Sequence, residues 1–188
     1  MNPVVFPLSL LVFALIWSAA CWDLRHRRIP NKLVLTGVVL GIAVQWWLGG
    51  IGGLLDSLAG LAVGLAILMP GYLVGTTGAG DVKLMAAAGT FLGPYLALLA
   101  GLASIAVGGL IALGFMVVAG FSSGSTSPWS RYGLMLKTLF ATGRPIYLVP
   151  DEGEVMGRKF PFAVSIAMGT SSLLIWLAWQ SPLIGMTS

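Results

Sequence analysis

The chain contains little charge and almost no cysteine or histidine. Only 9% of its 188 residues are charged, against about a quarter in a soluble domain, while 57% are hydrophobic. The single cysteine, Cys21, excludes an internal disulfide and a paired-cysteine zinc site, and we expect it to pack as a small hydrophobic residue in a helix. The one histidine, His26, lies in a basic cluster without a second metal ligand or a nucleophile, so we interpret it as a solvated loop residue. The composition therefore excludes a soluble domain, and the sequence predicts neither a metal site nor a cofactor.

Lysine and arginine are also missing from the first residues of the chain. Without them the N-terminal apolar run lacks the positive region of a cleaved signal peptide, and we expect it to remain as a membrane helix. A membrane helix needs about 20 apolar residues, and the chain has several such runs. We predict an all-α polytopic membrane protein with one domain, residues 1–188, formed by a bundle of six transmembrane helices. The predicted spans are residues 3–22, 33–48, 54–74, 82–93, 95–121 and 160–179, with a cytoplasmic loop at 122–159.

Glycines mark the contacts and the ends of these spans. Two pairs are spaced for close helix approach, Gly37 with Gly41 and Gly60 with Gly64. The turn at residues 49–53 is glycine-rich, and Gly93-Pro94 is suited to end one helix and start the next. A division near Gly101 is the alternative, and both divisions predict the same topology.

The basic residues predict how the chain is oriented. All ten lie in, or at the edge of, the loops that join spans 1–2, 3–4 and 5–6: Arg25, Arg27, Arg28, Lys32, Lys83, Arg131, Lys137, Arg144, Arg158 and Lys159. Because cytoplasmic loops carry an excess of Lys and Arg, both termini are expected outside the cytoplasm. The net charge of +4 is then explained by these loops, and no nucleic-acid partner is expected. This topology also puts Asp23 and Asp81 at the same face of the membrane.

Asp81 closes the most unusual stretch of the chain, Gly78-Ala79-Gly80-Asp81. A carboxylate beside hydrocarbon is costly, which favours a functional role. The alternative is that Asp81 only caps a helix that begins at Val82. Asp23, which follows the first span, has an alternative as an interfacial carboxylate paired with a nearby arginine, Arg25 or Arg27.

Together the two aspartates offer a specific chemistry if their helices are neighbours. Two carboxyls a few ångströms apart do not both ionise easily, so they share a proton. One can then draw a proton from water while the other protonates a substrate carbonyl oxygen, which is aspartic peptide hydrolysis. A proton relay in a small transporter or channel could use the same carboxylates, and a non-catalytic assembly scaffold would use neither.

Several motifs resemble those of the bacterial type IV prepilin peptidases, which are GxGD-type aspartic proteases. They are Asp23 with Arg28-Ile29-Pro30-Asn31, then Gly78-Ala79-Gly80-Asp81-Val82-Lys83-Leu84, and Lys159-Phe160-Pro161-Phe162-Ala163. The resemblance implies that Asp23 and Asp81 are the catalytic pair and that Gly78, Gly80 and Lys83 support the motif. It implies an inner-membrane enzyme, without cofactor, that cuts prepilins or pseudopilins after a glycine, between a short basic leader and an apolar helix. Membrane lipids and a pilus or secretion assembly machinery are the other implied partners.

The chain departs from the longer members of that family in its first loop. That loop is about ten residues long here and lacks the paired CxxC motifs of a cytoplasmic domain. We therefore expect no N-methyltransferase activity, and the chain is more similar to the short Flp/Tad-type enzymes or the archaeal preflagellin peptidases.

An acidic group lies in the long polar segment, at Asp151, Glu152 and Glu154. The basic loops of the chain should repel a basic leader, so these three side chains are candidates to receive it. The alternative is a solvated acidic turn. The oligomeric state and the choice of pilin stay open at this point.

Overall fold

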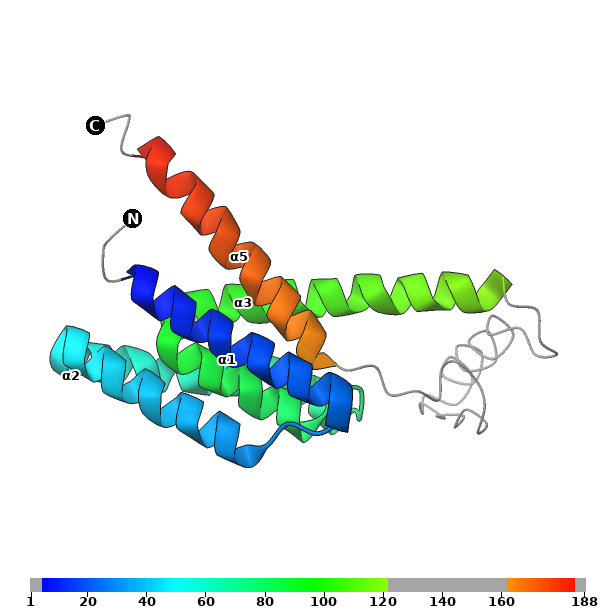
Figure 1. Ribbon diagram of the computed structural model, residues 1–188, viewed down its shortest axis with the longest axis horizontal. Helices are drawn as coiled ribbons and strands as arrows, with labels where there is room; N and C mark the ends of the chain where they lie inside the picture. Colours follow the sequence, from blue (N-terminus) through cyan, green and yellow to red (C-terminus); the bar gives the residue numbers. More distant parts are fainter. Residues whose placement is uncertain (1–4, 122–161, 185–188) are drawn as a thin grey trace, which may run out of the picture. The chain divides into compact units, whose positions relative to one another are not determined.

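The computed structural model describes residues 5–121 and 162–184, and this part of the chain is entirely α-helical apart from its connections. The helices are α1 (Val5–His26), α2 (Asn31–Leu73), α3 (Ala79–Phe121) and α5 (Phe162–Ile184), labelled in Figure 1. The predicted all-α class is confirmed for these residues. The chain divides into two compact units, and the one treated below consists of residues 1–108 and 161–188. Of the other, residues 109–160, the structure describes only the end of α3.

Four of the described helices are long and apolar enough to cross a membrane. The candidate spans are Leu8–His26, Asn31–Leu73, Ala79–Gly114 and Phe162–Trp179. Their surfaces suit lipid, since large apolar side chains lie exposed along them and Trp47 is 90% exposed. The protein is therefore a multi-pass membrane protein in its described part, while the count of six crossings stays a prediction.

Both long helices are interrupted at a glycine. α2 and α3 have 43 residues each, which at about 1.5 Å per residue is roughly twice the thickness of a bilayer core. Gly50 (φ 58°) and Gly93 (φ 73°) have backbone angles that glycine adopts at little cost, and Pro94 follows the second break. A Cβ on Gly53 would overlap the carbonyl oxygen of Gln45, so the chain folds back on itself at Gly50. The breaks match the predicted turn at residues 49–53 and the predicted division at Gly93-Pro94.

Small residues bring the second half of α2 against the start of α3. A Cβ on Gly60 would overlap the carbonyl oxygen of Gly89, and a Cβ on Gly89 would overlap that of Gly60. One turn away, a Cβ on Gly64 would lie 2.5 Å from the carbonyl oxygen of Met85. The two segments therefore run antiparallel with their backbones in contact, which confirms that Gly60 and Gly64 face a neighbouring helix.

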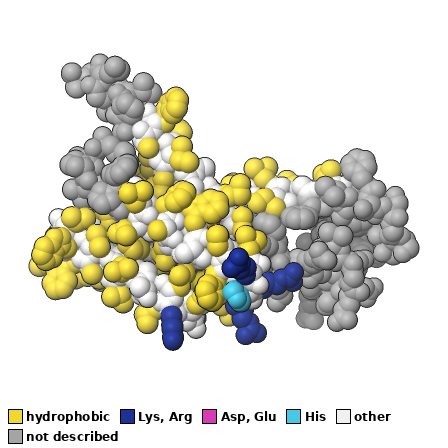
Figure 2. Space-filling model, in the orientation of Figure 1, with side chains coloured by type: hydrophobic (Ala, Val, Ile, Leu, Met, Phe, Trp, Pro, Cys, Tyr) yellow, Lys and Arg dark blue, Asp and Glu magenta, His cyan; other side chains and the backbone are white. Residues whose placement is uncertain are grey.

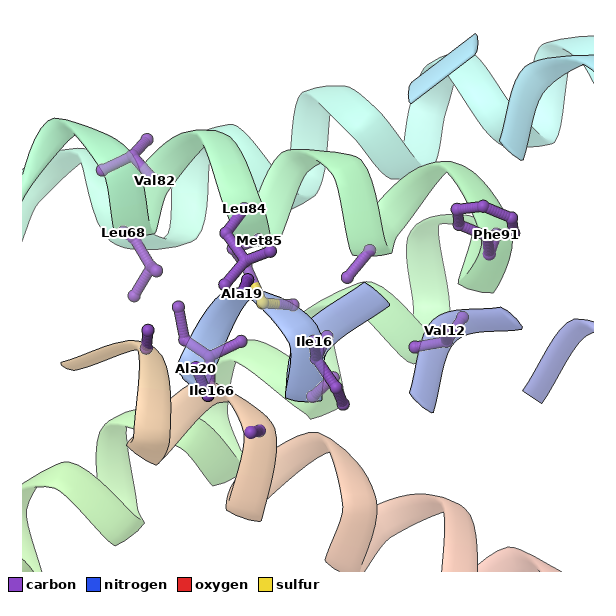
Figure 3. Close-up of a cluster of buried hydrophobic side chains, with 14 residues drawn as sticks. Val12, Ile16, Ala19, Ala20, Leu68, Val82, Leu84, Met85, Phe91 and Ile166 are labelled. Atoms are coloured by element: carbon purple, nitrogen blue, oxygen red, sulfur yellow. The ribbon is translucent and has the colours of Figure 1, made fainter. Parts of the chain in front are cut away.

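The buried core joins all four helices. Its members are alanines and larger apolar side chains, several of them labelled in Figure 3. They are Val12, Ile16, Ala19 and Ala20 of α1, Leu68 of α2, Val82, Leu84, Met85, Ala88, Phe91 and Ala100 of α3, and Ala163, Ile166 and Ala167 of α5. A hydrogen bond of 3.1 Å from the Trp17 indole N–H to Ser171 Oγ also joins α1 to α5. Because small side chains allow close backbone approach, the C-terminal end of α1 and the N-terminal end of α3 are held side by side.

Three local expectations from the sequence are wrong. α1 continues to His26, beyond the predicted end at residue 22, so Asp23 lies inside its last turn. α3 begins at Ala79, three residues before the predicted start, which removes Asp81 from the capping position. Cys21 lies in a helix as expected but is exposed on its surface instead of packed.

Candidate active site

Asp23 is turned inward by the face of α1 that carries it. Ala19 and Ala20, which precede it by four and three residues, are buried in the core, and residues at these spacings share one helix face. Asp23 is accordingly only 8% exposed. Among the described residues no ion pair joins it to Arg25 or Arg27, both of which are exposed. Its interpretation as the partner of a nearby arginine is therefore not supported.

The end of α1 directly follows this carboxylate. Arg27 has φ = 51°, the left-handed conformation with which many helices end, and its N–H donates to the carbonyl oxygen of Asp23 at 2.7 Å. The connection to α2 comprises only residues 27–30, and α2 starts right after Pro30. The short connection ties the position of Asp23 to the start of α2.

Asp81 lies in the first turn of α3 and is also 8% exposed. Its Oδ2 accepts a hydrogen bond of 3.0 Å from the N–H of Gly78, and the Gly78 carbonyl oxygen accepts from the Asp81 and Val82 N–H groups. Gly78 is thus the residue before the helix, and Asp81 reaches back to it from the third helical position, as one half of a capping box does. One carboxylate oxygen of Asp81 is held by the backbone in this way.

The turn before α3 is built by residues that the sequence analysis did not single out. The N–H groups of Thr76 and Thr77 donate to the carbonyl oxygen of Gly71 at 2.9 and 3.2 Å. The Thr76 hydroxyl donates to the same oxygen at 2.9 Å, and the Thr77 hydroxyl donates to that of Leu68 at 3.4 Å. These bonds tie the turn to the end of α2. The sequence signal that could have predicted this turn is the pair of threonines that follows Pro70-Gly71, since threonine hydroxyls readily bond to nearby backbone.

The two motif stretches of the sequence contact each other. A Cβ on Gly80 would lie 3.3 Å from Cβ of Ile29, and the Lys83 Nζ donates to Asn31 Oδ1 at 3.3 Å. Residues 29 and 31 follow Asp23 in the chain, and residues 80 and 83 flank Asp81. The structure thus places the glycine motif against the connection that leaves Asp23.

These contacts bring the two aspartates to one place. Their helices share the same core cluster, in which Ala19 lies beside Leu84 and Met85 in Figure 3. Asp23 and Asp81 therefore lie at the same end of these helices, and each is 8% exposed. Two nearly buried carboxyls that come close together can hold one proton between them.

Basic side chains gather at the end of the helices that carries this pair. Those of the described residues at this end of the helices are all exposed: Arg25, Arg27, Arg28, Lys32 and Lys83. Figure 2 shows Lys and Arg side chains on this face, with His26 beside them. His26 is exposed as predicted, but it lies in the last turn of α1 and not in a loop, and its ring stacks on Trp22 with 4.6 Å between ring centroids. The described basic residues therefore give this end of the helices a positive rim.

One predicted feature, the acidic group, falls on residues that the structure does not describe. Asp151, Glu152 and Glu154 lie outside the described residues. Within the described ranges, no group of three or more His, Cys, Asp or Glu side chains could hold a metal ion.

Comparison with protein families shows which family the chain belongs to. The model of the type IV leader peptidase family, Peptidase_A24, matches residues 10–113, more than half of the sequence. The chain belongs to this family. The match includes Asp23 and the whole Gly78–Asp81 stretch, and membership implies a membrane-embedded aspartic-type peptidase with prepilin substrates. No curated protein and no solved structure matches this leader peptidase.

Proposed function

We propose that this leader peptidase uses Asp23 and Asp81 as its catalytic pair. Its proposed reaction is the cleavage of Flp-like type IV prepilins or pseudopilins after a glycine, at the cytoplasmic face of the inner membrane. The observation that carries the proposal is the contact between the two segments that hold these nearly buried carboxylates, with Gly80 against Ile29 and Lys83 bonded to Asn31. The family match supports the reaction class, since it covers both residues.

The chemistry follows from a single proton held between two carboxyls. The ionised carboxyl takes a proton from water, whose oxygen attacks the scissile carbonyl carbon, while the protonated carboxyl gives its proton to the carbonyl oxygen. The tetrahedral intermediate then breaks its C–N bond, and a proton passes to the leaving amine. The Gly78 N–H holds one oxygen of Asp81 throughout, which leaves the other oxygen of that carboxylate for the reaction.

The proposed topology has six crossings with both termini outside the cytoplasm. The breaks at Gly50 and Gly93 support it, because each divides a helix that is too long for one crossing. The charge distribution supports the orientation, since every described basic residue lies at the end of the helices that carries the aspartates. The helical stretch from Ala79 to the break at Gly93 is short for a crossing, so Asp81 is placed slightly below the membrane surface.

The proposed enzyme is of the short Flp/Tad type and does not methylate its product. The connection between α1 and α2 has room only for residues 27–30, which supports the absence of the cytoplasmic domain of longer relatives. Cleavage alone is then its activity, and the new N-terminus of the pilin leaves unmodified for the pilus or secretion machinery.

The decisive test replaces each carboxylate by an amide of nearly the same shape. Asp23→Asn and Asp81→Asn are each expected to lower kcat by about 10²- to 10⁴-fold, because the pair loses its acid or its base. The measurement is the cleavage of a prepilin with a basic leader, a glycine junction and an apolar helix, in proteoliposomes. Asp56→Asn is the matched control, because Asp56 is an exposed carboxylate of α2.

Full activity of either well-folded aspartate variant would refute the pair. Proton flux through the proteoliposomes without any cleavage by the wild-type protein would favour a proton relay. Pilus assembly that survives the double substitution would favour a non-catalytic scaffold.

A further inference from the structure

The connection after α1 and the first residue of α2 contact the start of α3 at two points. Ile29 lies against Gly80, and Asn31 accepts a hydrogen bond from Lys83. We call these four residues, Ile29, Asn31, Gly80 and Lys83, the clasp. We infer that the clasp aligns Asp23 with Asp81, so that Ile29 and Asn31 are positioning residues for the cleavage. This inference rests on the proposed function, but its geometry can be tested without it.

The apolar contact of the clasp depends on the missing side chain of Gly80. A Cβ there would meet three atoms of Ile29 at 3.3, 3.4 and 3.5 Å, the closest being its Cβ. The 3.3 Å approach is tighter than most Cβ contacts, so an added methyl group must push Ile29 or the first turn of α3 by a few tenths of an ångström. Gly80 directly precedes Asp81, so the displacement occurs next to the residue that carries the carboxylate. The second glycine of the motif is therefore needed for a contact with another segment.

The Asp23 side of the site has few other restraints. Asp23 makes no ion pair within the described residues, and its backbone carbonyl accepts from Arg27 in the last turn of α1. Arg27 holds a left-handed conformation that costs a non-glycine residue free energy, so the surrounding contacts must maintain it. Ile29 follows two residues later. A shift of Ile29 is thus passed through a short, strained connection to the end of α1.

The polar contact of the clasp restrains the same connection from its far end. Lys83 follows Asp81 by two residues, and Asn31 is the first residue of α2. Their hydrogen bond is 3.3 Å long and exposed. It links the residue two positions after Asp81 to the first residue of α2. The clasp thus joins both sides of Asp81 to the segment that follows Asp23.

The first experiment is a double-mutant cycle on the apolar contact. Gly80→Ala is expected to lower kcat by about tenfold with little change in KM, since a misplacement of about 1 Å in an active site costs up to a hundredfold. Ile29→Ala alone removes the Cδ1 and Cγ1 atoms at 3.4 and 3.5 Å, keeps the Cβ, and lowers kcat less. In the double variant the alanine methyl at position 80 meets only the Cβ of residue 29, which is freer to shift without the rest of the side chain, so kcat should exceed the product of the two single effects. Gly52→Ala is the control, because a Cβ there meets nothing within 4 Å.

The polar contact is tested by a conservative and a disruptive change. Asn31→Asp keeps an oxygen for Lys83 and should retain kcat, whereas Asn31→Leu should lower kcat and leave KM unchanged. A purely structural role would instead lower the amount of folded enzyme while kcat per folded molecule stays constant. Independent, multiplying effects of Gly80→Ala and Ile29→Ala, or equal activity of the two Asn31 variants, would overturn the clasp.

A second measurement reads the alignment without catalysis. Asp23→Cys and Asp81→Cys are combined with Cys21→Ser, which removes the only other thiol, and the pair is cross-linked with a short bismaleimide. Adding Gly80→Ala or Asn31→Leu should slow the cross-link, and Gly52→Ala should not. An unchanged rate would overturn the clasp even if the wild-type enzyme cleaves prepilin. An inactive wild-type enzyme whose cross-link still responds would overturn the proposed function alone.

Discussion

At the scale of single residues, the backbone at Gly78 sets the orientation of the Asp81 carboxylate. The N–H of Gly78 donates to Oδ2, and a Cβ on Gly78 would lie 3.0 Å from this same oxygen. The absence of a side chain therefore serves the hydrogen bond directly. The first glycine of the motif acts on the carboxylate itself, and the second glycine, Gly80, acts on a neighbouring segment.

Gly78→Ala is expected to lower kcat by about tenfold or more, because the methyl group displaces the oxygen that the N–H holds. KM should change little if the substrate binds elsewhere along the helices. The measurement is steady-state cleavage in proteoliposomes, with Gly49→Ala as control because a Cβ on Gly49 has open space around it. Unchanged kcat in the Gly78 variant would mean that this bond does not orient the carboxylate for reaction.

The sequence predicted both aspartates and their common face, since the positions of the basic residues alone orient the helices. It could not predict that Asp81 reaches back to Gly78. Ala79 and Gly80 show no apolar periodicity, and glycine disfavours helix, so the pattern suggested a start at Val82. The contact of Ile29 with Gly80 was equally beyond prediction, because two segments about fifty residues apart meet only once the helices have packed.

At the scale of helices, the packing of the second half of α2 against the first part of α3 positions the helix that carries Asp81. Gly-rich and Gly-Pro sequences predicted where these helices break, because few other residues allow such backbone angles. The glycine spacing also predicted that Gly60 would face a helix. The identity of the facing residue, Gly89, depends on the rotation and depth of both helices, which no local pattern encodes.

Gly60→Ala should therefore destabilise the fold by about 1 to 3 kcal/mol, the usual effect of overpacking. Its new methyl group would overlap the carbonyl oxygen of Gly89, and backbone cannot move aside as a flexible side chain can. The gain in helix propensity of about 1 kcal/mol offsets only part of this strain. The measurement is the midpoint of thermal unfolding in detergent. Gly109→Ala is the control and should be neutral or stabilising, because a Cβ there has open space. Equal midpoints for both variants would contradict the close packing of Gly60 against Gly89.

At the scale of the whole molecule, charge decides how a substrate reaches the aspartates. The described part of the site presents an exposed rim of arginine and lysine at the end of the helices that carries the two nearly buried acids. A basic leader approaching this rim is repelled, so a second surface must attract it. The acidic residues outside the described ranges, Asp151, Glu152 and Glu154, are the remaining carboxylates besides Asp56 and the pair itself.

Reversing all three of these charges to lysine should raise KM for a basic-leader prepilin by about tenfold at low salt, with kcat nearly unchanged. The difference should shrink as salt is added, because the screening length falls from about 30 Å at 0.01 M to about 8 Å at 0.15 M ionic strength. Asp56→Lys is the control, since Asp56 lies in the half of α2 that begins near the opposite end of the helices. A KM that stays the same at every salt concentration would assign the acidic group to a solvated turn. In that case the attraction of the leader must come from lipid or from a partner, since the described rim can only repel it.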